Sequence, residues 1–242
     1  MRVAIHQPHY LPWLGYVDKI DRAELFICLD SVQFERKGWQ NRNYIKTPNG
    51  PAMLTIPAAR RDHRPLICDQ VVDESRPWRE KHRRTIESSY RNAPHWATHA
   101  AKLLAVYDMA AEHLVEYAVE STRAVLRGFG VTTPCVRASR LGEVSGAKTA
   151  LVAELAARVG ATTLVSGEGC RRYLDVELLE RHGVTVEWQS FVHPVYPQIH
   201  LRPGFVPRLA AFDLLANVGP DSLGLLRETQ RTARPAPVPE VH

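Results

Sequence analysis

The 242-residue sequence lacks the features that mark membrane, secreted and disulfide-stapled proteins. It has no run of about 18 apolar residues, the length that a membrane-spanning helix needs. Its first residues, MRVAIHQPHYLPW, contain neither a long apolar run nor a small-residue cleavage site, so we expect no signal peptide and a cytoplasmic location. The four cysteines, Cys28, Cys68, Cys135 and Cys170, form no C-x-x-C pair, which argues against a zinc ribbon or a disulfide framework.

The composition is that of a globular domain. Hydrophobic residues make up 45% of the chain, enough for one sizeable core, and the length suits one α/β domain better than two small ones. We predict a single domain over residues 1–230 and a proline-rich disordered tail at 231–242. The net charge of +5 permits an anionic substrate such as a phosphate, nucleotide or tRNA without requiring one.

The order of predicted elements indicates the fold class. Residues 2–5 and 25–29 are apolar strand candidates, and Pro12 favours the start of a helix between them. Further strands are predicted at 52–57, 162–165 and 184–191, and further helices at 78–90, 96–110, 112–127, 148–159, 175–181 and 207–217. We therefore expect an α/β single domain with a mostly parallel central sheet flanked by helices and a Rossmann-like opening βαβ unit.

Polar residues, and one glycine, follow four of the predicted strands. They are His6 and Gln7, then Asp30 and Gln33, then Ser166 and Gly167, and finally His193, Tyr196 and Gln198. Because the carboxyl ends of parallel strands meet at one edge of a sheet, we expect these groups to share a cleft.

The first of these segments, His6-Gln7-Pro8-His9-Tyr10, is the most informative. A histidine between a first strand and a first helix can meet a phosphate or a developing negative charge. Nucleotidylyl-transferase folds carry a histidine loop at this place, but the H-x-G-H pattern is absent here. The spacing of His6 and His9 is compatible with half a zinc site, yet no third ligand stands out, so we predict no metal.

Two other segments carry candidate chemistry. Residues 39–46, WQNRNYIK, interleave aromatic rings with cations and amides and could recognise a phosphate, a sugar or a base. Cys170 precedes two arginines near a predicted helix start, which makes it the best nucleophile candidate among the cysteines. A small residue facing the core is the interpretation that we favour for Cys170.

Four separated pieces of the chain resemble the WbqC-like protein family. They are IHQPHYLPWLGYVDKI, LDSVQFERKGWQNRNYIKT, SGEGCRRYLD, and FVHPVYPQ followed by FVPRLAAFDLLANVG, in order from residue 1 to about residue 224. The resemblance implies a tailoring role in O-antigen-type or natural-product biosynthesis: transfer of an acyl or aminoacyl group to an amine of a sugar or small metabolite, forming an amide.

The resemblance also implies functional residues. The family pattern falls on His6, Gln7, Tyr10, Asp30, Gln33, Asn41, Arg42, Lys46, Ser166, Gly167, Tyr173, Asp175, His193, Tyr196, Gln198, Asp213 and Asn217. Cys170 lies outside this pattern.

Roles in an amide-forming transferase follow from the chemistry of these groups. We expect His6, His193 and Asp30 to be catalytic, with a histidine as general base. We expect the substrates to be bound by Gln7, Tyr10, Gln33, Asn41, Arg42, Lys46, Ser166, Gly167, Tyr196 and Gln198. Among these, Arg42 and Lys46 would hold a phosphate, and Asn41 or the backbone at Ser166 would hold an oxyanion.

The partners stay open on the sequence alone. The acceptor would be a small-molecule amine, and the donor could be acyl-CoA, a carrier protein, an acyl-adenylate or aminoacyl-tRNA. No cofactor and no oligomeric state are indicated. The alternatives are a non-catalytic binding module for a sugar nucleotide or acyl carrier and a nucleotidylyl-transferase-like adenylating enzyme. A catalytic site needs a base within hydrogen-bond reach of a reacting atom, whereas a binding module does not.

Overall fold

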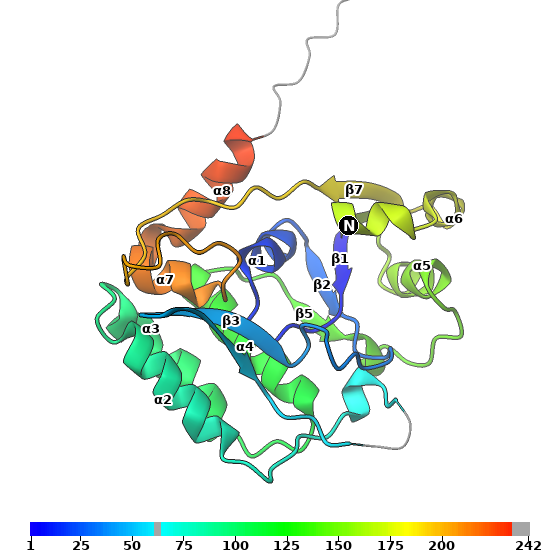
Figure 1. Ribbon diagram of the computed structural model, residues 1–242. Helices are drawn as coiled ribbons and strands as arrows, with labels where there is room; N and C mark the ends of the chain where they lie inside the picture. Colours follow the sequence, from blue (N-terminus) through cyan, green and yellow to red (C-terminus); the bar gives the residue numbers. More distant parts are fainter. Residues whose placement is uncertain (61–63, 234–242) are drawn as a thin grey trace, which may run out of the picture.

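A parallel sheet forms the centre of the molecule. The computed structural model describes residues 1–60 and 64–233 (Figure 1). Within them, five parallel strands stand in the order β5-β2-β1-β6-β7. Their bounds are β1 (Arg2–His6), β2 (Leu25–Cys28), β5 (Cys135–Arg137), β6 (Thr163–Gly167) and β7 (Thr185–Gln189). The predicted α/β class with a mostly parallel sheet is confirmed.

The opening of the chain folds as the sequence indicated. Helix α1 (Leu14–Asp21) connects β1 to β2, and the two strands pair in parallel with Ile5 beside Ile27. This confirms a parallel βαβ unit, while its Rossmann-like character stays a prediction. Pro12 lies two residues before the helix, and Arg22 ends it.

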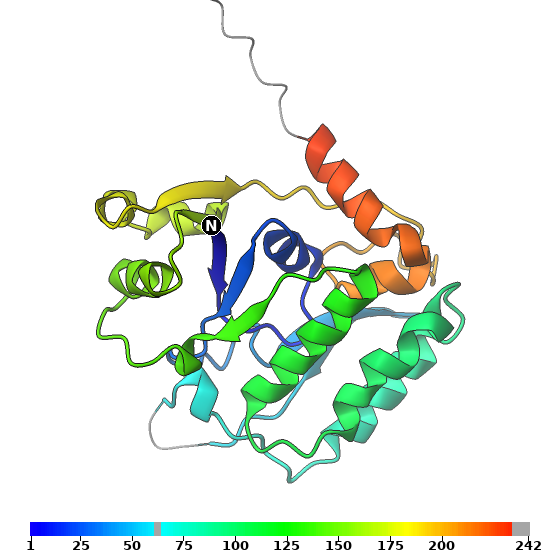
Figure 2. The ribbon, with the colours of Figure 1, turned by 180° about the vertical axis from the view of Figure 1, so that it is seen from behind.

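Helices cover both faces of the sheet, because its strands alternate apolar side chains. On β2, Phe26 packs into the larger core and Ile27 into the smaller one. The smaller core includes residues of α5 (Thr149–Arg158) and α6 (Val176–Arg181). The larger core includes residues of α1, α2 (Trp78–Tyr90), α3 (Trp96–Leu104), α4 (Leu114–Phe129), α7 (Phe212–Val218) and α8 (Ser222–Thr232). Figures 1 and 2 show these two groups on opposite sides of the sheet.

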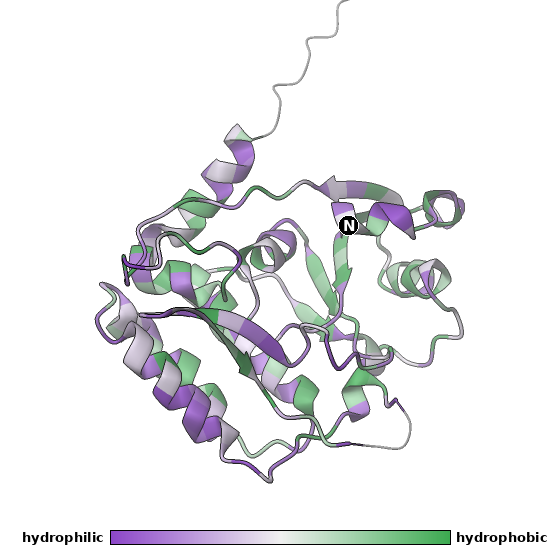
Figure 3. Ribbon diagram, in the orientation of Figure 1, coloured by the Kyte–Doolittle hydropathy of each residue, from purple (hydrophilic) through white to green (hydrophobic). Residues whose placement is uncertain are grey.

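The hydropathy pattern matches this layering. Figure 3 shows β1 and β2 largely in the hydrophobic colours, whereas much of α2 is hydrophilic. Helix α2 turns His82, Ile86 and Tyr90 inward at intervals of four residues, together with Trp78. The predicted bounds of this helix, 78–90, are confirmed.

A small antiparallel hairpin stands apart from the main sheet. Strands β3 (Arg42–Thr47) and β4 (Gly50–Thr55) pair from Thr47 and Gly50 at the turn to Arg42 and Thr55 at the open end. Gly50 has a φ of 105°, a conformation that glycine adopts without strain. The sequence predicted only the second strand, because the polar residues of β3 do not alternate in the usual way.

A long segment without regular structure joins β7 to α7. We call residues 190–211 the strap. The prediction of a helix from residue 207 was wrong at its start, since α7 begins at Phe212. Helix α8 was not predicted, and it contains the first two residues of the predicted tail, 231 and 232. Residues 234–242 of that tail lie outside the described residues.

Candidate functional site

A cleft of about 690 Å³ opens between the end of β1, the hairpin and the strap. It lies within the size range of small-molecule sites. The lining residues come from three segments that are far apart in the sequence. They are His6, His9, Trp13, Trp39, Asn43, Tyr44, Pro51, Val206, Pro207, Arg208 and Leu209.

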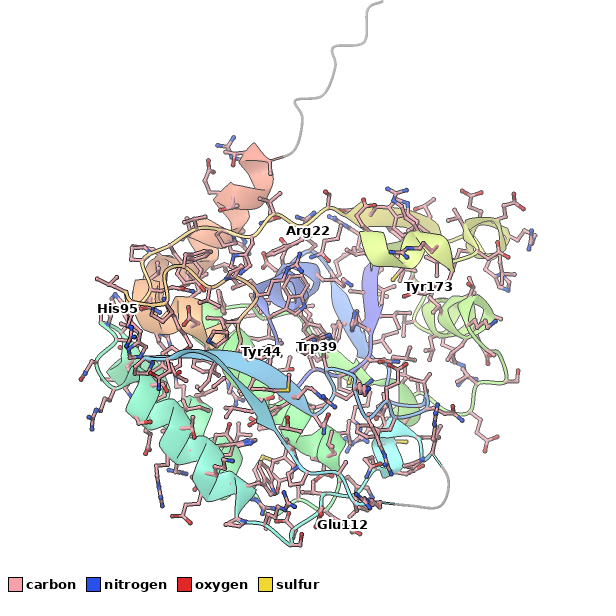
Figure 4. All side chains as sticks on the ribbon, in the orientation of Figure 1. Arg22, Trp39, Tyr44, His95, Glu112 and Tyr173 are labelled. Carbon is pink, nitrogen blue, oxygen red and sulfur yellow. The ribbon has the colours of Figure 1, made fainter. Side chains whose placement is uncertain are left out.

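Aromatic rings form one wall of this cleft. Trp39 keeps 46% of its surface exposed, and its ring centroid lies 6.3 Å from that of Tyr44. Figure 4 shows the two residues side by side, facing the space between β3 and α1. The backbone of Trp39 is fixed, because its carbonyl accepts a 3.1 Å hydrogen bond from the Tyr10 N–H. A large exposed ring on a fixed backbone can stack on a flat ligand at little entropic cost.

Two histidines lie at the end of β1. His6 Nδ1 lies 3.0 Å from the Gln7 carbonyl oxygen. A carbonyl only accepts, so Nδ1 carries the proton and Nε2 has a free lone pair. The ring of His9 stands edge-on to His6 at 4.9 Å and stacks on Tyr16 at 4.6 Å. Burial and the nearby Lys19 lower the pKa of His6 to about 3, so its imidazole is neutral at physiological pH.

Lys19 lies close to these two histidines without lining the cleft, and it was not predicted as a site residue. Lys19 follows Tyr16 by three residues, so the two side chains share one face of α1. Only 7% of Lys19 is exposed. Burial lowers its pKa, with Cys170 and Asp18 opposing the shift. The residues VDKI are typical of an exposed helix surface. Only the three-residue spacing of Lys19 from Tyr16 could have indicated that Lys19 is buried.

His193 lies in the strap behind the cleft wall. Its Nδ1 donates to the Pro194 carbonyl at 2.8 Å, and its Nε2 accepts the Arg208 N–H at 3.0 Å. Arg208 has a φ of 60°, a conformation that a non-glycine residue adopts at a cost. Since both ring nitrogens are engaged, the geometry favours a positioning role for His193 over the predicted role as a base. It holds Arg208, the cation at the cleft.

A buried polar network fastens the strap to the hairpin and α7. Lys46 Nζ donates to Gln198 Oε1 at 3.1 Å, and Gln198 Nε2 donates to Asp213 at 2.9 Å. Asp213 also accepts from the hydroxyls of Tyr90 at 2.7 Å and Tyr196 at 2.8 Å. The predicted substrate-binding residues Lys46, Gln198 and Tyr196 are therefore committed to one another, and they support the cleft without lining it.

Asp30 is fully buried at the end of β2. Its carboxylate accepts from Arg137 Nε at 2.6 Å, and from the backbone N–H and hydroxyl of Ser139 at 2.8 and 2.7 Å. These bonds join the ends of β2 and β5. The geometry favours a structural role for Asp30, which does not line the cleft.

Three further residues of the predicted site do not line the cleft. Gln7 Oε1 accepts from Gln40 Nε2 at 2.7 Å, which ties the first loop to the segment before β3. Tyr10 is buried in the larger core, where its hydroxyl meets His82 Nδ1 at 2.9 Å. Gln33 is exposed.

The amides and the arginine before and within β3 have different surroundings. Asn41 Nδ2 donates to the Ile56 carbonyl at 2.7 Å and so anchors the hairpin. Its neighbour Asn43, which the sequence did not single out, lines the cleft and donates to the Leu11 carbonyl. Arg42 forms no ion pair with any described residue, and its buried Nε has no hydrogen-bond partner. Its predicted contact with an anion stays a prediction.

The end of β6 lies beside Lys19. Ser166 and Gly167 pair in register with Trp188 and Gln189 of β7. A Cβ atom placed on Gly167 would lie 3.4 Å from Lys19 Nζ. Cys170 follows in a 3₁₀ turn and has its Sγ 2.9 Å from the Tyr173 hydroxyl. Figure 4 shows Tyr173 well apart from Trp39 and Tyr44.

The described residues hold no group of three or more metal-binding side chains. His6 and His9 therefore lack a third ligand of the kind that zinc requires in this part of the chain. In the same residues, no helix is long and apolar enough to cross a membrane.

Comparison with known proteins gives two matches. The model of the WbqC-like protein family matches residues 7–224. The chain is also 30% identical over 230 residues to the uncharacterized protein Rv1507c of Mycobacterium tuberculosis (strain ATCC 25618 / H37Rv), covering 93% of this chain and 97% of that protein. No solved structure matches the chain significantly.

Proposed function

This chain belongs to the WbqC-like protein family, and we propose that it transfers an acyl or aminoacyl group onto the amine of a sugar or other small metabolite. One observation carries the proposal: a neutral imidazole with a free Nε2, that of His6, lines an aromatic-walled cleft of about 690 Å³. Amide formation needs an acceptor amine that is held beside an activated carbonyl, and an uncharged imidazole can accept a hydrogen bond from that amine.

Each wall of the cleft has a part in this reaction. Trp39 and Tyr44 stack on a flat portion of the donor, and the Arg208 guanidinium holds its phosphate or carboxylate. His6 Nε2 accepts a hydrogen bond from an N–H of the amine and orients the nitrogen lone pair. Asn43 is the amide group that lines the same cleft.

The test is product formation by the purified protein. An acyl-CoA, an acyl carrier protein, an acyl-adenylate and an aminoacyl-tRNA are each offered with a panel of amino sugars and small amines. We expect one pairing to give a product with the mass of the amine plus the acyl group less one hydrogen. His6→Gln should lower the rate of product formation at least about tenfold, a small effect for the loss of a contact that positions a substrate. His182→Gln, an exposed change, is the control.

Two results would speak against the proposal. Saturable binding of a sugar nucleotide or carrier without any product would favour the binding module. Release of pyrophosphate from ATP in the absence of an amine would favour the adenylating enzyme.

A further inference from the structure

Among the described residues that line the cleft, Arg208 is the one with an ionised side chain. The others are aromatic, apolar or amide residues, together with two histidines whose pKa values are lowered by burial. None of the lining residues is an aspartate or a glutamate. The Arg208 side chain is exposed and makes no hydrogen bond or ion pair with any described residue. This lining carries a positive charge without a counter-charge, which favours a ligand that bears an anion.

The backbone of Arg208 adopts a conformation that costs free energy. Its φ of 60° lies in the left-handed region, which arginine seldom adopts. Residues 206–209 all line the cleft, whereas an extended segment would turn alternate side chains to opposite faces. The left-handed residue breaks that alternation and so allows consecutive residues to face the same space. Backbone strain of this kind persists only where the surrounding structure enforces it.

The strap is fixed on both sides of Arg208. Gln198 accepts a hydrogen bond from the Val206 N–H at 2.9 Å and donates one to the Val206 carbonyl at 3.0 Å. The Ala210 N–H donates to a carbonyl of β3 at 2.8 Å. Between these two anchors, the Arg208 N–H donates to His193 Nε2 at 3.0 Å. The conformation of residue 208 therefore depends on His193, while the rest of the strap has its own contacts.

The imidazole of His193 is itself held in one orientation and one tautomer. Its Nδ1 donates to the Pro194 carbonyl, which leaves the lone pair of Nε2 to accept the Arg208 N–H. Its ring stacks on Tyr196 at 6.3 Å and stands edge-on to Phe205 at 5.8 Å. His193 does not line the cleft, so we expect it to act on a ligand through Arg208.

We propose that Arg208 binds the anionic group of the ligand, and that His193 sets the strength of this binding by holding Arg208 in its left-handed conformation. Arg208 contacts the ligand, and His193 is a positioning residue. The proposal rests on the proposed function, since it concerns the donor in the same cleft. A backbone that is already fixed reduces the entropy that the arginine loses on binding. With the rings of Trp39 and Tyr44 in the same cleft, the site selects a planar group that bears a phosphate or a carboxylate.

Hydrogen exchange of backbone amides tests the bond to His193 in the unmodified protein. The Arg202 amide is the internal reference, because Arg202 is an exposed strap residue whose N–H donates to no described residue. We expect the Arg208 amide, measured by NMR and corrected for its sequence neighbours, to exchange at least about fivefold more slowly, the factor that one ordinary hydrogen bond supplies. Equal exchange rates would overturn the proposal.

Matched pairs of probes measure how tightly the cleft holds an anion. Naphthalene-1-sulfonate is planar and permanently charged, and naphthalene-1-sulfonamide is its uncharged counterpart. Adenosine 5′-monophosphate with adenosine, and benzoate with benzamide, distinguish a phosphate site from a carboxylate site. We expect at least one charged probe to bind more tightly than its partner, and the ratio of the two affinities reports the anion contact alone. No preference for the charged member of any pair would contradict the proposal.

Variants of the arginine show whether it makes this contact. Arg208→Gln should lower the ratio of affinities by about ten- to hundred-fold, the scale of a hydrogen bond to a charged group. Arg202→Gln, which removes an exposed arginine of the same strap, is the control and should leave the ratio unchanged. An equal fall in both variants would mean that the preference comes from the general charge of the surface.

Variants of His193 test its positioning role. His193→Leu removes the acceptor of the Arg208 N–H and should lower the ratio by about three- to tenfold, the effect of one ordinary hydrogen bond, without weakening the uncharged probe. His193→Gln offers an amide oxygen as the acceptor and should restore most of the ratio. A merely structural role would weaken both probes together and would not be rescued by glutamine.

The control for a loosened strap is a second histidine of the same segment. His200 Nε2 donates to the Ser89 carbonyl at 2.6 Å, and neither residue lines the cleft. His200→Leu therefore removes one strap contact without touching Arg208, and the ratio of affinities should stay as in the unmodified protein. A fall equal to that of His193→Leu would assign the effect to the strap as a whole and overturn the role of His193.

The two proposals fail in different ways. Product formation with an unchanged KM for the donor in Arg208→Gln and His193→Leu removes the anion contact and leaves the transferase. A ratio of affinities that depends on both residues, without product from any donor, removes the transfer and leaves the anion site.

Discussion

Two lysines of this protein are nearly fully buried, and their surroundings differ sharply. Lys46, 1% exposed, donates to Gln198 Oε1 and to the Gly204 carbonyl at 2.7 Å, with Asp213 close by as the counter-charge. Lys19, 7% exposed, has no such donor contacts among the described residues. The first amine stabilises the fold through its hydrogen bonds, whereas the second makes none with the described residues. A buried charge is informative about function when its hydrogen bonds are missing.

The network around Lys46 also explains how the strap forms a cleft wall. The strap has no strand or helix of its own between residues 190 and 211, so side chains must fix it. Asn217 of α7 adds to this by accepting the Ile199 N–H at 2.9 Å and donating to the Asp213 carbonyl at 2.7 Å. Breaking the network should therefore lower the free energy of unfolding, and it should also displace the cleft wall that the strap forms.

The largest effect is expected from Asp213→Ala. This change leaves Lys46 as a buried cation without its nearby counter-charge, along with two tyrosine hydroxyls without an acceptor. Leaving a buried charge uncompensated costs about 3–5 kcal/mol. Urea unfolding should show this loss, with Asp221→Ala on the surface as the control. A loss under about 1 kcal/mol, the scale of one ordinary hydrogen bond, would mean that the strap is held in another way.

The buried imidazole of His6 should make the folded protein less stable in acid. The folded-state pKa of His6, about 3, lies below the ordinary 6.5, so between these values the unfolded chain binds the extra proton. The free energy of unfolding therefore falls as pH drops below 6.5, by about 1.4 kcal/mol per pH unit for each such histidine. The decrease levels off near the folded-state pKa. Unfolding free energies from pH 7 to pH 4 measure this slope. His6→Gln should flatten it, whereas the exposed His182→Gln should leave it unchanged.

A smaller effect with the opposite sign is expected from Lys19→Met. Replacing this largely buried lysine, whose amine makes no hydrogen bond with the described residues, by an apolar chain of similar length should raise the free energy of unfolding by about 1–2 kcal/mol at pH 7. The folded-state pKa of Lys19 is lowered, so the cost of the charge is present below that value and disappears as pH approaches about 10.4, the unfolded value. The gain should shrink accordingly in a denaturation series toward high pH. A variant that is less stable than the original would show that Lys19 is a structural residue like Lys46.

The elements that depend on local sequence patterns could be predicted. The βαβ opening and α2 follow from apolar periodicity, which is local, and both were predicted. The interleaved segment 39–46 was predicted as a recognition element, and Trp39, Asn43 and Tyr44 do line the cleft. Strand β3 was missed, since its polar side chains Lys46 and Asn43 are buried against the strap and against the Leu11 carbonyl, and nothing local in the sequence indicates that packing.

The residues that bear charge were the hardest to assign. Residue type suggested catalytic or binding roles for His193, Asp30 and Lys46. Each of them instead forms hydrogen bonds with residues that are distant in the sequence. Lys19 looked like helix surface and is buried. Residue type can be read from the sequence, but whether a polar group is satisfied depends on contacts across the whole fold.

The smallest expected effect on stability is that of Trp39→Ala, and it separates the wall of the cleft from its supports. Trp39 is 46% exposed and touches Tyr44 only at a ring distance of 6.3 Å, so its removal should change the unfolding free energy by no more than about 0.5 kcal/mol. Its contribution should appear in binding instead. Loss of a stacking platform costs about 1–3 kcal/mol, or roughly five- to 150-fold in affinity. Isothermal titration with the donor found by the product screen measures the loss, and Trp188→Ala, whose ring stacks under Arg171 away from the cleft, is the matched control. If Trp39→Ala unfolds the protein as Asp213→Ala should, Trp39 is a support of the fold, and the aromatic wall cannot be assigned to a ligand.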